Sequence, residues 1–173
     1  MDAIQPCELP EDALLRKYKL EGAWADCYCT EVARRVSHAE YVEAFYTTVL
    51  FKVERQLLAW FVAKPSTDAQ AHQLAAGDLD WFAAWNVEAR NPHQLVMADF
   101  QCRTRSWLMV APTNSGVAEG TRLYFGSAIV PVGSARSGTP RLGLAFRSLL
   151  GFHKIYSRAL LSAARARLEK ASR

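Results

Sequence analysis

The alternation of apolar and polar positions predicts a strand near the beginning of the chain. From Leu20 to about Val32 the side chains alternate with a period of two residues, which is typical of a β-strand. One face of this stretch mixes aromatic and polar side chains, whereas the other face carries only small ones. Such a small face indicates that another backbone or a helix approaches it closely. The small residues are Ala23, Ala25, Cys27 and Cys29.

The next stretch has helical periodicity. Ser37 and Glu40 have the spacing of a capping box, in which each side chain accepts a hydrogen bond from the backbone N–H group of the other residue. Apolar residues then recur at helical spacing across residues 38–62. The β-branched cluster Thr47-Thr48-Val49 weakens the middle of this stretch. We therefore expect two consecutive helices or one kinked helix.

A short helix and a series of strands are predicted next. Ser66 is the expected N-cap of a helix over about residues 67–76, which Gly77 ends. Gly126 lies inside the last strand-like run and indicates a bulge or a close backbone contact. The two middle runs of the series predict a hairpin or one long bent strand. The strand-like runs cover residues 81–90, 94–100, 103–110 and 122–132.

The last predicted element is a long amphipathic helix from Leu142 to about Lys170, which no proline interrupts. Strands that are grouped together and helices that are segregated from them favour an α+β fold. We expect an antiparallel curved sheet packed against the long C-terminal helix, with a helix pair after the first strand. Residues 1–17 are expected to form an extended lead-in, and residues 18–173 a single domain.

This order of elements resembles the helix-grip fold of the START-like superfamily, which includes polyketide cyclases and lipid-transport proteins. The segments TRLYFGS (residues 121–127) and LLGFHKIYSRALL (residues 149–161) are similar to the last strand and the terminal helix of bacterial members. The resemblance implies a sheet that curls around the C-terminal helix. It also implies a ligand cavity between the two, or an enzyme of the cyclase or hydratase type.

Composition and cysteine content narrow the class of protein. A length of 173 residues suits one domain, and 50% hydrophobic with 22% charged residues excludes collagen-like, disordered and coiled-coil chains. The longest apolar run, residues 57–63, is far short of the roughly 20 residues that a bilayer requires. Residues 1–6 have no basic region followed by an apolar one, so we expect no secretory signal, and 4 cysteines make no dense disulfide framework. We expect a cytoplasmic protein with reduced thiols.

Candidate site residues lie where the long helix would cross the sheet. A ligand pocket requires a mainly apolar lining with a few convergent polar groups, and a histidine on the helix can serve as acid or base near neutral pH. Alternatively, the aromatic residues form core and His153 makes a structural hydrogen bond. The candidate ligand-binding residues are Trp24, Asp26, Tyr28, Trp85, Arg105, Trp107, Tyr124, His153 and Tyr156.

No motif in the sequence identifies a reaction. The chain has no nucleophile elbow, P-loop or dinucleotide-binding glycine motif. Cys27 and Cys29 form a single C-x-C pair without a recognisable second pair of ligands, so we predict neither a metal site nor a cofactor.

Charge is distributed unevenly along the chain. The net charge of +4 combines +7 on residues 141–173 with −3 on residues 1–140. The basic helix can dock on the chain's own acidic surface, attract phosphates, or be a solvated face. No nucleic-acid-binding motif accompanies it, so we predict no nucleic-acid partner.

Three functions are compatible with these observations. The first is binding of a small apolar or amphipathic molecule between the sheet and the terminal helix. The second is a structural or self-association module, such as a homodimer, without a ligand. The third, a cyclase or hydratase, rests on the family resemblance alone.

Overall fold

Among the described residues, seven strands form one antiparallel sheet in the order β1-β2-β7-β6-β5-β4-β3. The structure is a computed structural model that describes residues 4–53, 66–113, 119–130 and 144–171, with the side chains of the last helix from His153 onward. The strands are β1 (Gln5–Pro6), β2 (Trp24–Val32), β3 (Trp81–Phe82), β4 (Trp85–Asn91), β5 (Gln94–Asp99), β6 (Thr104–Thr113) and β7 (Gly120–Ile129).

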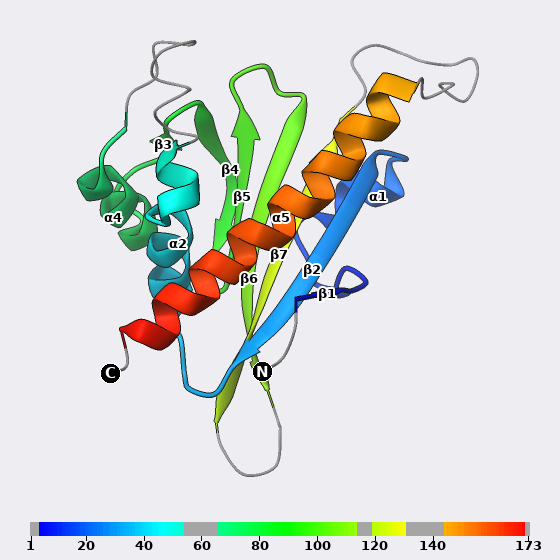
Figure 1. Cartoon of the computed structure of the whole chain (residues 1–173). Coiled ribbons are helices and arrows are strands. Elements are labelled where there is room, and N and C mark those ends of the chain that lie inside the picture. Colours follow the sequence, from blue (N-terminus) through cyan, green and yellow to red (C-terminus); the bar gives the residue numbers. More distant parts are fainter. Residues whose placement is uncertain (1–3, 54–65, 114–118, 131–143, 172–173) are drawn as a thin grey trace.

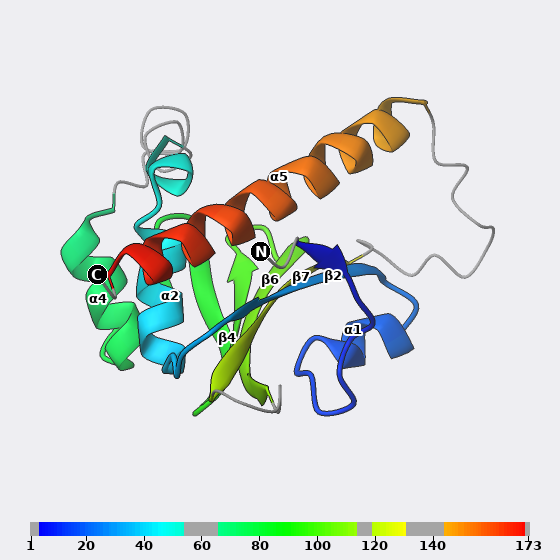
Figure 2. The same cartoon turned by 60° about the horizontal axis from the view of Figure 1, so that its bottom comes forward.

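The long helix and the shortest helix lie on opposite faces of this sheet. Figures 1 and 2 show α5 crossing one face diagonally, with α2 and α4 beside its end, whereas α1 lies against the other face. Helix α5 packs on β2, β7 and α2. The predicted α+β class, with helices after the first long strand and a C-terminal helix on an antiparallel sheet, is confirmed. The helices are α1 (Arg16–Leu20), α2 (His38–Tyr46), α4 (Asp68–Ala76) and α5 (Leu144–Lys170).

The two faces of the sheet bury separate hydrophobic clusters. We name them the α5 face, where Tyr28, Leu108 and Phe125 are buried, and the reverse face, where Cys27 and Trp107 are buried. The five longer strands, β2 and β4 to β7, contribute to both clusters because their side chains point alternately to either side. Within the described residues, no helix is both long and apolar enough to cross a membrane.

Helix α2 begins at the predicted capping box and ends just before the β-branched cluster Thr47-Thr48-Val49. Ser37 and Glu40 form the capping box. The helix ends at Tyr46, and the hydroxyl groups of Thr47 and Thr48 donate to the backbone oxygens of Glu43 and Phe45, at 2.6 and 3.0 Å. Helical backbone resumes over residues 49–53, so the stretch contains two helical segments up to that point. The remainder of the predicted helix pair, residues 54–62, lies outside the described residues.

Two local predictions are corrected. The N-cap of α4 is Thr67 rather than Ser66, because Thr67 and Gln70 form a second capping box. The predicted strand at residues 81–90 is in fact a hairpin, in which β3 pairs with β4 around a turn where Ala83 has a φ of 52°. By contrast, β5 and β6 form a hairpin, one of the two arrangements that the sequence predicts, and Gly77 ends α4 in a left-handed conformation as expected.

The small face of β2 is covered by the N-terminal segment. Leu15 is fully buried there, and Ala13 and Tyr18 pack in the same cluster. A Cβ atom on Gly126 would lie 2.8 Å from the carbonyl oxygen of Asp26 and 3.0 Å from Leu15 Cδ2. The close approach predicted from the small residues and from Gly126 is therefore confirmed.

Candidate functional site

The register of the sheet brings polar side chains together below α5. Asp26 of β2 lies directly opposite Ser127 of β7, which in turn lies opposite Ser106 of β6. Residues that are directly opposite in antiparallel strands project to the same face. The three side chains therefore form one row on the α5 face, at the level where α5 carries His153.

Ser127 links the sheet to the helix. Its Oγ atom lies 2.7 Å from Asp26 Oδ1 and 2.7 Å from His153 Nε2. A hydroxyl has one proton, and a carboxylate oxygen can only accept. With Asp26 ionised, Ser127 donates to Asp26 and accepts from His153, so the imidazole proton lies on Nε2. The ring of Trp24 meets the ring of His153 edge to face, with centroids 5.7 Å apart.

Two oxygens near this row are buried without a hydrogen bond. Asp26 Oδ2 has no hydrogen-bond partner and lies 3.9 Å from His153 Nε2. Ser157 Oγ, one helical turn after His153, is also buried without a partner. Burial and the charge of the nearby Asp26 together raise the pKa of Tyr28 to about 12. A buried oxygen without a hydrogen-bond partner lowers the stability of the fold. Together the two oxygens leave this end of the core with hydrogen-bonding capacity that no protein group among the described residues meets.

A pocket of about 280 Å³ lies between the sheet and α5 next to these groups. One part of its wall is aromatic and aliphatic, and the other part is polar and includes Ser127, His153 and Ser157. Phe100 also lines it and is half exposed, which places this side of the pocket at the surface. The apolar wall comprises Phe45, Tyr46, Phe51, Ala84, Trp85, Phe125, Tyr156 and Leu160.

The structure distributes the nine predicted site residues between the two faces. Trp85, Arg105, His153 and Tyr156 are among the residues that line the pocket. Asp26 reaches the pocket through Ser127, Trp24 contacts the ring of His153, and Tyr28 belongs to the core on the same face. Trp107 and Tyr124 belong to the reverse-face cluster instead.

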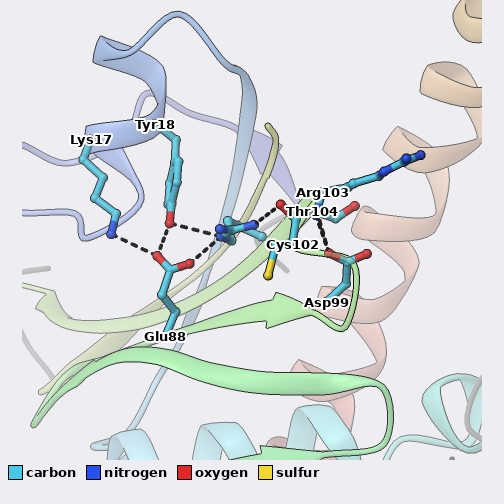
Figure 3. A network of polar contacts seen from close by, with 8 residues as sticks. Lys17, Tyr18, Glu88, Asp99, Cys102, Arg103 and Thr104 are labelled. Atoms are coloured by element: carbon cyan, nitrogen blue, oxygen red, sulfur yellow. Dashed lines mark hydrogen bonds and ion pairs between the residues drawn. The ribbon is translucent and has the colours of Figure 1, made fainter. Parts of the chain in front are cut away.

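The guanidinium group of Arg105 also lies away from the pocket, in a network on the reverse face. Its Nε atom donates to Glu88 Oε2 at 2.6 Å and to the hydroxyl oxygen of Tyr18 at 3.0 Å. Figure 3 shows Lys17 and Tyr18 of α1 both pointing at Glu88. Burial raises the pKa of Glu88, but hydrogen bonds from Tyr18 and Lys17 and the charge of Arg105 outweigh burial and lower it. These hydrogen bonds and ion pairs hold α1 against strands β4 and β6.

Sequence reasoning missed several residues of the site. Ser127, Ser106 and Ser157 are small polar residues that look unremarkable in a strand or a helix. The period of two places Ser127 on the same face as Phe125, and Ser157 follows His153 by one helical turn. These signals were present, but only the register with Asp26 shows which serine faces a carboxylate.

Among the described residues, neither a second hollow nor any cluster of metal-ligating side chains supports a functional site as well as the pocket does. A second hollow of about 620 Å³ is lined by His93 and by residues within 35–40, 110–113 and 119–121, and no phenylalanine, tyrosine or tryptophan is among these described lining residues. In the described part of the chain, no group of three His, Cys, Asp or Glu side chains is arranged to hold a metal ion.

Comparisons with known proteins leave the site to be interpreted on its geometry. No protein-family model matches the sequence, no curated protein is significantly similar to it, and no solved structure matches this fold.

Proposed function

We propose that the chain binds a small, mainly apolar molecule with one polar group in the pocket between the sheet and α5. The observation that carries this proposal is the pocket itself, in which an aromatic wall meets a polar end where the Ser157 hydroxyl is buried without a hydrogen-bond partner. Ligand sites are mostly apolar concavities with a few well-placed polar groups. The order of elements also resembles the START-like helix-grip fold, and that resemblance supports a ligand between the sheet and the terminal helix.

The size of the pocket limits the ligand. An enclosed apolar cavity of about 150 Å³ holds benzene, so 280 Å³ suits a molecule of one or two rings. The hydroxyl of Ser157 is available to the polar group of such a ligand, and His153 and Ser127 lie beside it. The ring of such a ligand would pack against the apolar part of the wall. A hydroxyl, carbonyl or carboxyl group on the ring would meet the polar part.

The test is a binding screen of the purified full chain. We would record saturation-transfer NMR spectra with a panel of one-ring and two-ring aromatic alcohols, ketones and acids. Ser157→Leu fills the pocket, and we expect it to weaken each binder at least about tenfold, the range that corresponds to 1.4 kcal/mol or more. Ser162→Leu places the same side chain on the exposed side of α5 and is the matched control.

Two outcomes would overturn the proposal. One is that no member of the panel binds the chain. The other is that Ser157→Leu binds the panel ligands as tightly as the unchanged chain while its circular dichroism spectrum shows that it is folded. Loss of binding in Ser157→Leu but not in Ser162→Leu would support it.

A second candidate function, proton transfer, is favoured by the chain of contacts Asp26–Ser127–His153. If Nε2 carries the proton of neutral His153, the other ring nitrogen is a base, and Asp26 stabilises the imidazolium that forms. The panel ketones test this in D₂O, because a base that removes the α-proton exchanges it for deuterium. His153→Gln should abolish the exchange while binding persists; equal exchange in His153→Gln would exclude His153 as the base.

A further inference from the structure

Two cysteines face each other on the reverse side of the sheet. The Sγ atoms of Cys7 and Cys27 lie 3.2 Å apart, and the backbone N–H of Cys7 donates to the carbonyl oxygen of Cys27 at 3.0 Å. Pro6 pairs with Tyr28, so the same antiparallel register places Cys7 opposite Cys27. Opposite residues of this kind have Cα atoms about 5.5 Å apart, which is within the range that a disulfide bridges.

The two thiols differ in accessibility and in acidity. Cys7 is partly exposed, and a hydrogen bond from the Cys27 thiol lowers the pKa of Cys7 to about 7. Cys27 is buried, and its contact with Cys7 together with burial raises its pKa. An accessible thiolate beside a protonated second thiol is the arrangement of redox-sensitive cysteine pairs.

We propose that Cys7 and Cys27 are a modification site, at which hydrogen peroxide forms a reversible disulfide within the chain. The proposal is independent of the ligand pocket. A disulfide that forms only on oxidation fits the cytoplasmic compartment that the sequence predicts, where stable disulfides are rare and redox-sensing ones occur.

The reaction takes two steps. The Cys7 thiolate attacks one oxygen of the peroxide; an S–O bond forms, the O–O bond breaks, and the released hydroxide takes up a proton to become water. Cys7 is then a sulfenic acid. Cys27 sulfur attacks the Cys7 sulfur as its own proton leaves; the S–S bond forms, the S–O bond breaks, and a second water departs. The two thiols lose two electrons, and these reduce one peroxide to two waters.

The other two cysteines are less suited to the second step. Cys29 lies two residues further along β2, where the register places it opposite Gln5 rather than Cys7. Cys102 is exposed in the turn between β5 and β6 and makes no contact with Cys7 among the described residues. The disulfide would close a loop of roughly 20 residues and tie the N-terminal segment to β2, which constrains the unfolded chain.

The experiment uses the full chain, reduced and then freed of reductant. One equivalent of hydrogen peroxide should lower the free thiols from 4 to two. The intact mass should fall by about 2 Da, the two hydrogens lost on oxidation. Dithiothreitol should reverse both changes. Cys7→Ser should abolish the change, whereas Cys29→Ser and Cys102→Ser should retain it. Trypsin separates Cys7 from Cys27 but leaves Cys27 and Cys29 in one peptide, so Cys29→Ser also assigns the partner.

Each result decides the proposal. A cross-linked peptide joining Cys7 to Cys27 that dithiothreitol releases would support it. A disulfide to Cys29 or Cys102, or Cys7 oxidised to sulfinic acid with Cys27 still a free thiol, would overturn it. As a separate readout that does not need the buried residue to be changed, alkylation of Cys7 by iodoacetamide should rise with pH around pH 7 in the unmodified chain. A rise only above about pH 8.5, the value of an ordinary cysteine, would contradict the arrangement.

Discussion

The two faces of the sheet differ in how closely their side chains pack and in whether their polar groups have hydrogen-bond partners. On the reverse face the side chains meet closely and the polar groups are paired: Gln94 is buried, accepts from Trp107 Nε1 and from the backbone of Leu14, and donates to the carbonyl of Asp12. On the α5 face a pocket remains, and Asp26 Oδ2 and Ser157 Oγ have no hydrogen-bond partner.

This difference indicates which part of the molecule stabilises the fold and which part lowers its stability. Close packing and paired polar groups stabilise a fold, whereas unpartnered buried oxygens and empty volume destabilise it. Natural proteins tolerate such costs mainly where binding or catalysis needs them. We therefore expect substitutions on the reverse face to reduce stability strongly, and substitutions at the polar end of the pocket to reduce ligand binding instead.

The largest effect is expected from Trp107→Ala. Trp107 is fully buried, and its removal leaves a cavity and takes a hydrogen bond from Gln94. Losses of about 3–5 kcal/mol in the free energy of unfolding are typical of such truncations. Urea denaturation measures the change. The matched control is Trp81→Ala, where the side chain is 44% exposed, and it should change the free energy by no more than about 0.5 kcal/mol.

Gly126→Ala tests the close contact on the reverse face. The added Cβ would meet the backbone carbonyl of Asp26 and the side chains of Leu15 and Trp107. Overpacking of this kind costs about 1–3 kcal/mol. A double variant with Leu15→Ala isolates the Leu15 contact: it should relieve only that part of the clash, because the backbone oxygen of Asp26 and the ring of Trp107 stay in place. A Gly126→Ala chain as stable as the original would show that this face is less closely packed than described.

His38 provides a pH-dependent test on the α5 side. Burial lowers the pKa of His38 to about 4, and its Nε2 atom has no hydrogen-bond partner. Between pH 6.5 and pH 4 the unfolded chain therefore binds more protons at this residue than the folded chain, so stability falls as the pH falls through this window. The loss is about 2–3 kcal/mol, at 1.36 kcal/mol for each pKa unit.

Urea denaturation at several pH values should show this loss in the unmodified chain and a flatter profile in His38→Gln. Glu40 and Glu88 have lowered pKa values, so their contributions are lost only as the pH falls below about 4.5, which keeps the upper part of the window free of them. Equal slopes between pH 6.5 and 4.5 in both chains would contradict the assignment to His38.

The Arg105–Glu88 ion pair should contribute more than the Arg122–Glu31 pair. The side chains of the first pair are 10% and 23% exposed, and those of the second are 45% and 26% exposed. We expect Glu88→Gln to cost about 1–2 kcal/mol, because it leaves Arg105 partly buried beside a neutral amide. Glu31→Gln should cost less than about 1 kcal/mol, as exposed pairs usually do. Chemical denaturation of both variants, at low and at high salt, measures the difference.

The smallest effect, and one of opposite sign, is expected from Ser157→Ala. The substitution removes a buried hydroxyl that has no partner, so stability should stay unchanged or rise by up to about 1 kcal/mol. Binding of the panel ligands should weaken in the same variant. A loss of stability comparable to that of the reverse-face variants would mean that the two faces do not differ in the way we infer.

Sequence patterns predicted the elements better than the contacts between them. The face of β2 that carries Asp26 was predictable because its other face has only small side chains. The sequence predicts Arg105 and Trp107, at alternate positions of β6, as pocket residues, yet the guanidinium group of Arg105 and the ring of Trp107 lie on the reverse side. Both faces of β6 are covered by other elements, so both are apolar, and alternation alone does not indicate which one meets α5.

Two further features depend on information that local patterns do not contain. The turn of the β3–β4 hairpin has alanine at a positive φ, without the glycine or asparagine that usually marks such a turn. The contact of Ser127 with Asp26 joins residues 101 positions apart, and only the pairing of β2 with β7 creates it.

That pairing also has a consequence for how the chain is made. In the sheet, β2 lies between β7 and the two-residue β1. Most of the backbone hydrogen bonds of β2 therefore form only after β7, about 100 residues later in the chain, has left the ribosome. Loop closure over such a distance slows folding and leaves an apolar strand edge exposed in the meantime. For this chain, the interval between the synthesis of β2 and that of β7 is the period in which a chaperone would have most to protect.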